Sequence, residues 1–210
     1  MAFARVFIDG VDTDPNTAAI PVGDVGFVRG YGVFEVVKAV DGVCFRLPEH
    51  LDRLERSAAM LGIELPSREL LTRWAADAAD GIPEAIVRML VSAGDDPWEG
   101  PCRVIVTGEP ASPQMASLRL LPVNAPWHSD GAEWELLRGK TLSYANNFAA
   151  IRQARMAGFD DAVLIGRSGR VLEGPTFTVG WVVDEDGRDI YETPAMTTGI
   201  LDSITRTAVL

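Results

Sequence analysis

Two lysines are conspicuous in this chain because nearly all of its positive charge is carried by arginine. Lysine and arginine together number 19, and only Lys38 and Lys140 are lysines. Arginine keeps its proton near neutral pH and cannot act as an amine nucleophile, whereas a lysine with a lowered pKa on a rigid element can form a Schiff base with a carbonyl cofactor. Lys140 precedes a β-prone run, Thr141 to Tyr144, that suits this role. An ordinary surface lysine is the alternative, and spacing alone favours it.

Ordered blocks of sequence extend the argument beyond one lysine. Four in the second half resemble the pyridoxal-phosphate enzymes of the class IV aminotransferase family: Lys140-Thr-Leu-Ser-Tyr-Ala-Asn-Asn, Ala157-Gly-Phe-Asp-Asp-Ala-Val-Leu, Val171-Leu-Glu-Gly-Pro and Gly199-Ile-Leu-Asp-Ser-Ile-Thr-Arg. Two in the first half resemble its other signatures: Arg29-Gly-Tyr-Gly-Val-Phe-Glu35 and Phe45-Arg-Leu-Pro-Glu-His-Leu-Asp-Arg53-Leu. The resemblance spans nearly the whole chain.

This resemblance implies a residue for each requirement of pyridoxal 5'-phosphate. Lys140 would form the Schiff base and shuttle protons. Glu173 would keep the pyridine nitrogen protonated, so that the ring acts as an electron sink. Arg53 and the Ile204-Thr205 turn at a helix start would bind the phosphate, because an arginine and the positive end of a helix dipole both attract an anion.

The remaining candidates would shape the pocket or contact the substrate. Tyr144, Tyr31 and Leu201 would form its walls, and Tyr31 would also contact the substrate. Arg88 alternates with apolar neighbours on a predicted strand, and a cleft-facing arginine requires an anionic partner. The resemblance implies that Arg88 contacts the substrate carboxylate or the cofactor, and that Arg29 contacts the substrate.

Three functions stay open. The run after Lys140, with Glu173-Gly-Pro, looks more like the aminodeoxychorismate lyase branch than the branched-chain transaminases. Such a lyase converts 4-amino-4-deoxychorismate to p-aminobenzoate and pyruvate, a step of folate precursor synthesis. The alternatives are a transaminase of branched-chain or D-amino acids and a degenerate homologue without catalysis. Ser203 and Thr178 depart from the family's usual glycine and asparagine, and both read as subfamily choices.

Composition limits the partners and the compartment. The chain has 210 residues, 47% of them hydrophobic, and a formal net charge of -11, which argues against binding nucleic acid or anionic membranes. Cys44 and Cys102 lie in apolar contexts without a CxxC motif, so we expect reduced core residues and a cytoplasmic location. Only His50 and His128 are histidines, which excludes a histidine-rich metal centre. The resemblance also implies a homodimer.

The elements that must position these residues follow from periodicity in the first half of the chain. The sequence predicts a strand at 4–9, a hairpin in which Asp41-Gly42 joins strands 33–40 and 43–47, a helix from Pro48 to Gly62, and a second helix from Ser67 to Gly81. The first helix carries an apolar stripe beside a polar one. We expect Arg53 on this polar stripe to be functional and His50 to be solvated.

In the second half, the sequence predicts strands at 86–92, 103–107 and 117–121, then a helix from Asn146 to Gly158. Strands follow at 162–173, interrupted by a turn at 167–169, and at 177–183 and 189–192, and a helix begins at Ser203. We predict an α/β (α+β-like) two-domain fold of type IV: a small N-terminal domain at 1–121, a linker at 122–131 and a larger cofactor-binding domain at 132–210. The resemblance implies that this larger domain is incomplete at its C-terminal end.

Overall fold

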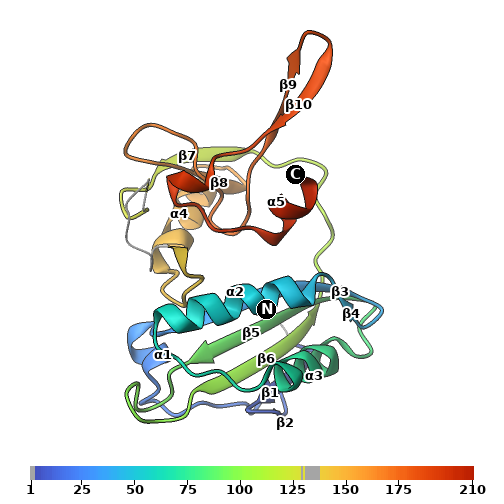
Figure 1. Ribbon diagram of the computed structural model, residues 1–210, viewed down its shortest axis with the longest axis vertical. Helices are drawn as coiled ribbons and strands as arrows, with labels where there is room; N and C mark the ends of the chain where they lie inside the picture. Colours follow the sequence, from blue (N-terminus) through green and yellow to red (C-terminus); the bar gives the residue numbers. More distant parts are fainter. Residues whose placement is uncertain (1–2, 129, 131–137) are drawn as a thin grey trace. The chain divides into compact units, whose positions relative to one another are not determined.

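The computed structural model describes residues 3–128, 130 and 138–210, and the chain forms two compact units (Figure 1). Unit 1 comprises Met1–Pro113 with Gly139–Ser143, and unit 2 comprises Gln114–Arg138 with Tyr144–Leu210.

The division between the units differs from the predicted domains. It falls after Pro113, ahead of the predicted linker at 122–131, because Leu120–Asn124 is a strand that pairs within unit 2. The predicted boundary at 131 and 132 lies outside the described residues. Lys140 belongs to unit 1, not to the second domain in which the prediction placed it.

Unit 1 is built on a six-stranded antiparallel sheet with strand order β2-β1-β6-β5-β3-β4. The predicted hairpin is confirmed: Asp41 and Gly42 both have positive φ, 49° and 79°, as a tight turn between β3 and β4 requires. The β4 strand is shorter than predicted because α2 begins within the range 43–47. The strands are β1 (Arg5–Ile8), β2 (Val11–Asp12), β3 (Gly32–Val40), β4 (Val43–Cys44), β5 (Glu84–Ser92) and β6 (Arg103–Pro110).

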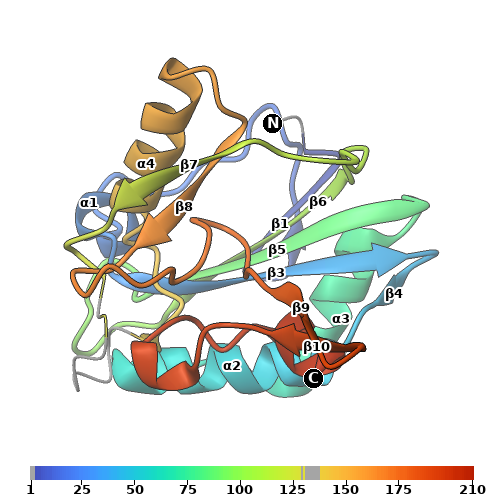
Figure 2. The ribbon, with the colours of Figure 1, turned by 90° about the horizontal axis from the view of Figure 1, so that it is seen from above.

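Helices α2 (Leu47–Met60) and α3 (Arg68–Ala79) cover one face of this sheet, as Figure 2 shows. Alternate strand residues point into the core on that side and pack against the apolar faces of both helices. The close contact between α3 and β6 requires a glycine at position 108, because a Cβ there would lie 1.8 Å from the carbonyl oxygen of Ala78 on α3. The core of unit 1 includes the buried side chains of Phe7, Val33, Val37, Leu51, Leu54, Ile63, Leu71, Trp74, Ile82, Val87, Met89 and Val91.

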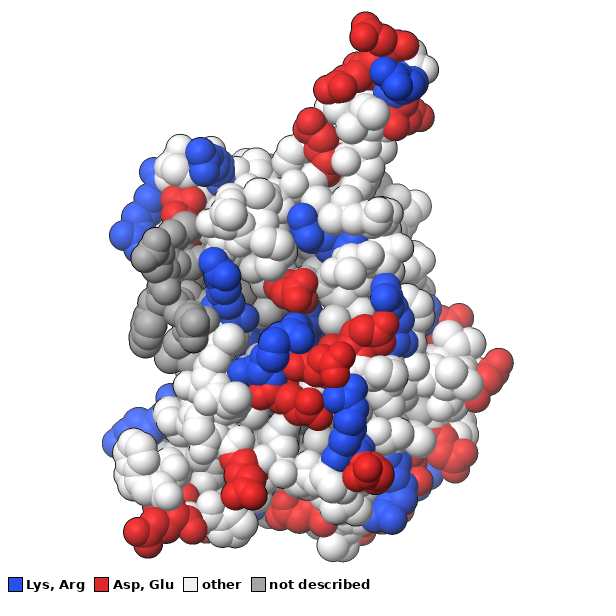
Figure 3. Space-filling model, in the orientation of Figure 1, with Lys and Arg blue, Asp and Glu red and all other residues white. Residues whose placement is uncertain are grey.

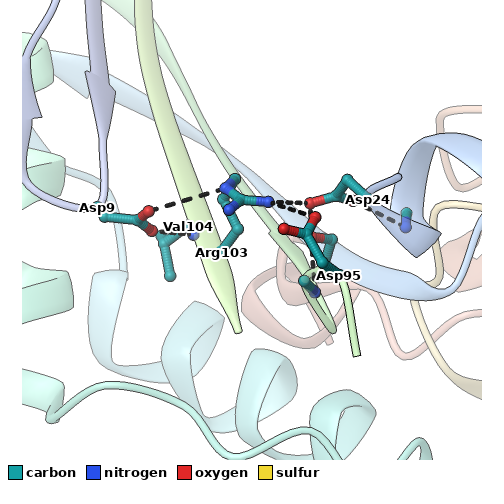
Figure 4. Close-up of polar contacts among 8 residues, drawn as sticks. Asp9, Asp24, Asp95, Arg103 and Val104 are labelled. Carbon is teal, nitrogen blue, oxygen red and sulfur yellow. Dashed lines mark hydrogen bonds and ion pairs between the residues drawn. The ribbon is translucent and has the colours of Figure 1, made fainter. Parts of the chain in front are cut away.

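A buried aspartate fixes the short helix α1 (Val25–Arg29) to the strands (Figure 4). Asp24 is 1% exposed and caps α1 by accepting a hydrogen bond from the backbone N-H of Gly26. Its other oxygen accepts hydrogen bonds from the Ser92 hydroxyl and from Nη1 of Arg103, each at 2.7 Å. The bond to Asp24 raises the pKa of Arg103, so this guanidinium stays charged. The loop before β3 is thereby held in place.

Unit 2 has a smaller framework. A parallel pair of strands, β7 (Leu120–Asn124) and β8 (Asp161–Ile165), packs against α4 (Ala145–Met156). Pro122 lies inside β7, which a two-stranded sheet tolerates because one edge of each strand is unpaired. The segment predicted as a strand up to Glu173 forms only an isolated bridge, Ile165 to Val171. The hydrophobic core of this unit contains Val123, Ala125, Ala150, Ala154, Ala162, Leu164, Leu172 and Ile200.

The rest of unit 2 is a hairpin and two short helices. Strands β9 (Trp181–Glu185) and β10 (Arg188–Glu192) form the hairpin, and Figure 3 shows acidic side chains gathered on it. A 3-10 turn, Met196–Thr198, and α5 (Ile204–Val209) follow. No helix among the described residues is long and apolar enough to cross a membrane.

The most deeply buried charge of unit 1 joins α2 to β3. Glu35 on β3 is 0% exposed. Its carboxylate accepts hydrogen bonds from Nε of Arg53 at 2.6 Å and from Nη2 of Arg53 at 2.7 Å. Nδ1 of His50 lies 2.7 Å from the same carboxylate. The expectation of a solvated His50 is therefore wrong, because the polar stripe of α2 faces this carboxylate. Burial alone would raise the pKa of Glu35, but the bonds to Arg53 and His50 outweigh it and lower the pKa.

Replacing Glu35 tests this arrangement. Glu35→Gln should lower the free energy of unfolding near neutral pH by about 3–5 kcal/mol, because it leaves the buried charge of Arg53 uncompensated. Urea denaturation measures this loss. The matched control is Glu84→Gln, which breaks an exposed ion pair with Lys38 and should change the free energy of unfolding very little.

The pH dependence has a definite sign. The pKa of Glu35 is lower in the folded than in the unfolded chain, so its stabilisation is present above the unfolded value and is lost as pH falls through the folded value. The difference in unfolding free energy between wild type and Glu35→Gln should shrink from about pH 6 to about pH 3. A difference that stays constant over that range would contradict an ionised Glu35.

Candidate active site

Lys140 is held by its backbone on two sides. Its carbonyl accepts a hydrogen bond from the N-H of Phe34 at 3.0 Å, and its own N-H donates to Oγ of Ser57 on α2 at 3.1 Å. Thr141 forms an isolated antiparallel bridge with Val33. The segment thus pairs with the edge of β3, and its lysine sits on a rigid support as the sequence predicted.

The side chain of Lys140 is buried, unlike that of the other lysine. Lys140 is 9% exposed, and its Nζ lies 4.2 Å from the centroid of the Phe34 ring. Lys38 has a half-exposed side chain that pairs with Glu84 at 2.8 Å. The alternative of an ordinary surface lysine therefore fits Lys38 and not Lys140.

Arg53 is positioned by the same helix as Ser57. The two bonds to Glu35 use two of the five N-H donors of its guanidinium. Ser57 donates to the carbonyl oxygen of Arg53 at 2.9 Å and also accepts from Lys140, which links the two predicted site residues through one hydroxyl.

The sheet face opposite the helices carries Arg88. This face includes Phe34 on β3, and strand pairing places Arg88 opposite Val36 and Thr107. Arg88 shares the face with its alternate neighbours, as predicted, and its Nη1 pairs with the carboxylate of Glu109 on β6. Thr107 has a buried hydroxyl without a hydrogen-bond partner among the described residues. The face is therefore polar beside an aromatic ring.

Two predicted substrate contacts of unit 1 have other partners. The hydroxyl of Tyr31 donates to the carbonyl oxygen of Leu61, just beyond α2, at 2.7 Å. Arg29 is exposed at the end of α1 and donates to the carbonyl oxygen of Val28. These bonds give Tyr31 a role in anchoring the end of α2 and leave Arg29 on the surface.

In unit 2, Glu173 receives a donor on each carboxylate oxygen. Oε2 accepts the backbone N-H of Leu201 at 3.1 Å, and Oε1 lies 3.0 Å from Nε2 of His128. The Glu173 side chain is 17% exposed, so it is mostly shielded from water. Leu201 was predicted as an apolar wall, and the contact that the structure gives it is through its backbone.

The predicted phosphate turn begins α5. Ser203 caps the helix, and its hydroxyl accepts the N-H of Arg206 at 3.2 Å. The N-H groups of Ile204 and Thr205 lie in the first turn, where no carbonyl of the helix can accept them. Nε of Arg206 is buried and has no partner among the described residues. Donors in excess at a helix start are a suitable environment for an anion.

Tyr144, the remaining wall candidate, immediately precedes α4 and is partly buried. The predicted residues thus fall into two groups. Unit 1 holds Lys140, Arg53, Arg88, Tyr31 and Arg29, and unit 2 holds Glu173, Leu201, Ile204, Thr205 and Tyr144.

Sequence reasoning missed several residues that position these groups. Phe34 and Glu35 lie inside one of the sequence blocks, and Ser57 lies on the polar stripe of the first helix, but none of the three had an assigned role. His128 was considered only as a possible metal ligand. Glu109 lay beyond the predicted end of its strand. The alternation of Ile105, Thr107 and Glu109 on β6 was the signal that could have extended that strand.

Comparisons with known proteins identify the family of this chain. The model of the Amino-transferase class IV family matches residues 32–210. A Mycobacterium tuberculosis protein named bifunctional aminodeoxychorismate lyase / D-amino acid transaminase is 32% identical over 196 residues, covering 86% of this chain and 67% of that protein. The aminodeoxychorismate lyase of Bacillus subtilis is 29% identical, covering 98% of this chain and 72% of its own.

Solved structures give the same result. A fold IV transaminase from Curtobacterium pusillum is 30% identical with a TM-score of 0.80, covering 95% of this chain and 70% of its own. A hypothetical aminotransferase from Mycobacterium tuberculosis, in its pyridoxal-phosphate-bound form, is 28% identical with a TM-score of 0.83, covering 98% of this chain and 76% of its own. The chain therefore belongs to the class IV aminotransferase family of pyridoxal-phosphate enzymes and has their type IV fold.

Proposed function

We propose that this protein is a lyase that converts 4-amino-4-deoxychorismate to p-aminobenzoate and pyruvate. The observation that carries the proposal is the 32% identity over 196 residues to a protein named for this lyase activity and for D-amino acid transamination. The run from Thr141 to Tyr144, which follows the buried lysine, supports the lyase branch.

The residues present fit pyridoxal phosphate by their donor chemistry. Glu173 is a shielded carboxylate whose oxygens are each held by one donor, which suits a protonated pyridine nitrogen. The first turn of α5 and the buried Nε of Arg206 present donors without acceptors, which suits a phosphate. Arg53 adds positive charge for the same group, and Lys140 supplies the amine that holds the cofactor.

Each protein group then has one task. Pyridoxal phosphate, when bound, supplies an electron sink. Lys140 removes the proton from the ring carbon that bears the substrate amino group. The neighbouring carbon-oxygen bond breaks, its electron pair leaves with the enolpyruvyl group, and protonation of that group gives pyruvate. Glu173 holds a proton on the pyridine nitrogen throughout, so the negative charge that develops is stabilised in a weakly screened site.

A transaminase is the second candidate. The observation that favours it is that relatives of similar coverage are named as aminotransferases, among them the D-alanine aminotransferase of Bacillus licheniformis at 28% identity. In that reaction Lys140 would move a proton between the substrate carbon and the cofactor. Arg88 would bind the substrate carboxylate in either case, in competition with Glu109. The working unit is a homodimer in the cytoplasm under both readings.

The first test concerns the lysine. Borohydride reduction of the cofactor-loaded protein, followed by peptide mapping, should place the pyridoxyl group on Lys140. Lys140→Ala should lose this label and lower turnover by at least about 10²–10⁴-fold, the usual contribution of a positioned acid-base group. Lys38→Ala is the matched control and should keep the label. A pyridoxyl group on Lys38 in the wild type would overturn the assignment.

The second test concerns the carboxylate. Glu173→Gln should still bind the cofactor, because the phosphate and amine contacts remain. Turnover should fall by about 10²-fold or more, because a neutral amide does not keep the pyridine nitrogen protonated. Cofactor absorbance and initial rates measure the two effects separately. Wild-type turnover in this variant would show that the electron sink does not depend on Glu173.

The third test distinguishes the two reactions. A lyase needs one substrate and regenerates pyridoxal phosphate after every turnover, so the protein should release pyruvate from aminodeoxychorismate with no added keto acid. Leucine or D-alanine alone should leave the cofactor absorbance unchanged. The transaminase candidate prevails if either amino acid converts the absorbance to that of pyridoxamine phosphate and aminodeoxychorismate gives no pyruvate.

A further inference from the structure

His128 and Glu173 meet beside the parallel strand pair of unit 2, because the chain turns back after β8 and the carbonyl oxygen of Glu173 accepts the N-H of Leu164 on β8. His128 follows β7 and Glu173 follows β8. Their Nε2 and Oε1 atoms lie 3.0 Å apart, and the two side chains are 10% and 17% exposed. With the Leu201 N-H on Oε2, the carboxylate has one donor on each oxygen, which fixes its rotation and leaves a lone pair on each oxygen for another donor.

Asp130 decides which nitrogen of His128 carries the proton. Its backbone N-H donates to Nδ1 of His128 at 3.4 Å, which requires a lone pair on that nitrogen. The neutral ring therefore carries its proton on Nε2 and donates it toward Glu173. Asp130 is itself fixed, because its carboxylate accepts hydrogen bonds from the backbone N-H and the hydroxyl of Ser168 at 2.7 and 3.0 Å.

We infer that His128 is a positioning residue that holds the carboxylate of Glu173 in a fixed plane while leaving it a net anion. This inference rests on the proposed role of Glu173 at the pyridine nitrogen. A neutral imidazole adds no charge, so the pair keeps one negative charge to complement a protonated pyridine nitrogen. An imidazolium at the same place would cancel that charge and weaken the hold on the ring proton. The Asp130 N-H uses the lone pair of Nδ1, which an imidazolium would not have.

The pair can be tested without cofactor. The chain has only two histidines, so a long-range ¹H-¹⁵N spectrum of the apo protein contains two imidazoles, and His128→Gln assigns them. His128 should show the neutral form protonated on Nε2. His50, whose Nδ1 faces Glu35, is the internal reference with the opposite geometry. A His128 ring protonated on Nδ1, alone or as an imidazolium, near neutral pH would overturn the inference.

Two variants test the positioning role in the loaded enzyme. His128→Phe keeps a ring but removes the donor, and should lower kcat by about 10-fold to 100-fold with little change in KM, the range seen when an outer partner of a functional group is lost. His128→Gln places an amide N-H near the position of Nε2 and should recover most of the lost kcat. Equal losses in both variants would show that the donor is not what matters.

A double-mutant cycle separates this role from a purely structural one. If His128 acts through Glu173, His128→Phe should lower kcat much less in a Glu173→Gln background than in the wild type. A full additional loss in that background would overturn the inference. Failure of the wild-type protein to bind pyridoxal phosphate would instead overturn the proposed function, while the apo spectrum would still decide the protonation of His128.

Discussion

A carboxylate with no contact to water must be fully paired, and Glu35 satisfies that requirement by joining β3 to α2. Arg53 meets it with two nitrogens and His50 with one, so the helix can sit on the sheet in only one rotation about its axis. That rotation also turns Ser57 toward the edge of β3, where its hydroxyl receives the backbone N-H of Lys140. The backbone position of Lys140 therefore depends on the ion pair between Glu35 and Arg53.

In unit 2 a carboxylate is also held by hydrogen bonds, but from no arginine among the described residues. Next to Glu173, unit 2 has a two-stranded parallel sheet, where unit 1 has six antiparallel strands. The carboxylate oxygens of Glu173 are held by one backbone N-H and one imidazole. The tight turn at Gly199, with φ of 80°, ends the 3-10 segment and brings the N-H of Leu201 to the carboxylate. In both units a candidate site residue is held by a backbone hydrogen bond: the N-H of Lys140 donates to Ser57, and the N-H of Leu201 donates to Glu173.

The lyase and the transaminase share these parts because both reactions begin with removal of a proton from the carbon beside the substrate nitrogen. What differs is the group that must be recognised next to that carbon. Arg88 is the proposed anchor for a substrate carboxylate, and its charge is balanced by Glu109, whose side chain is 13% exposed. In either proposed reaction a carboxylate would have to displace Glu109 or share the guanidinium, so this pair would set how strongly anionic substrates are held.

Local chemistry in the sequence determined much of the framework. Short-range rules predict the Asp41-Gly42 turn, the Ser67 cap and helices α2 and α3. They also predict the alternation that puts Arg88 on one strand face. The structure has all of these features. The ordered blocks determined the family, and the family resemblance suggested the roles proposed for Lys140 and Glu173. These signals lie within a few residues of one another, so a single sequence contains them.

Only the tertiary structure decided which polar residues meet. Glu35, Arg53 and His50 come from two elements whose packing no local pattern specifies, so a stripe that looked solvated is buried. Lys140 joins unit 1 because its backbone completes the edge of β3, although it lies far from that strand in sequence. His128 reaches Glu173 because it follows β7, while the segment that carries Glu173 turns back and pairs with β8, the parallel neighbour of β7. Such contacts are between residues distant along the chain, and their energy depends on burial that exists only once the chain has folded.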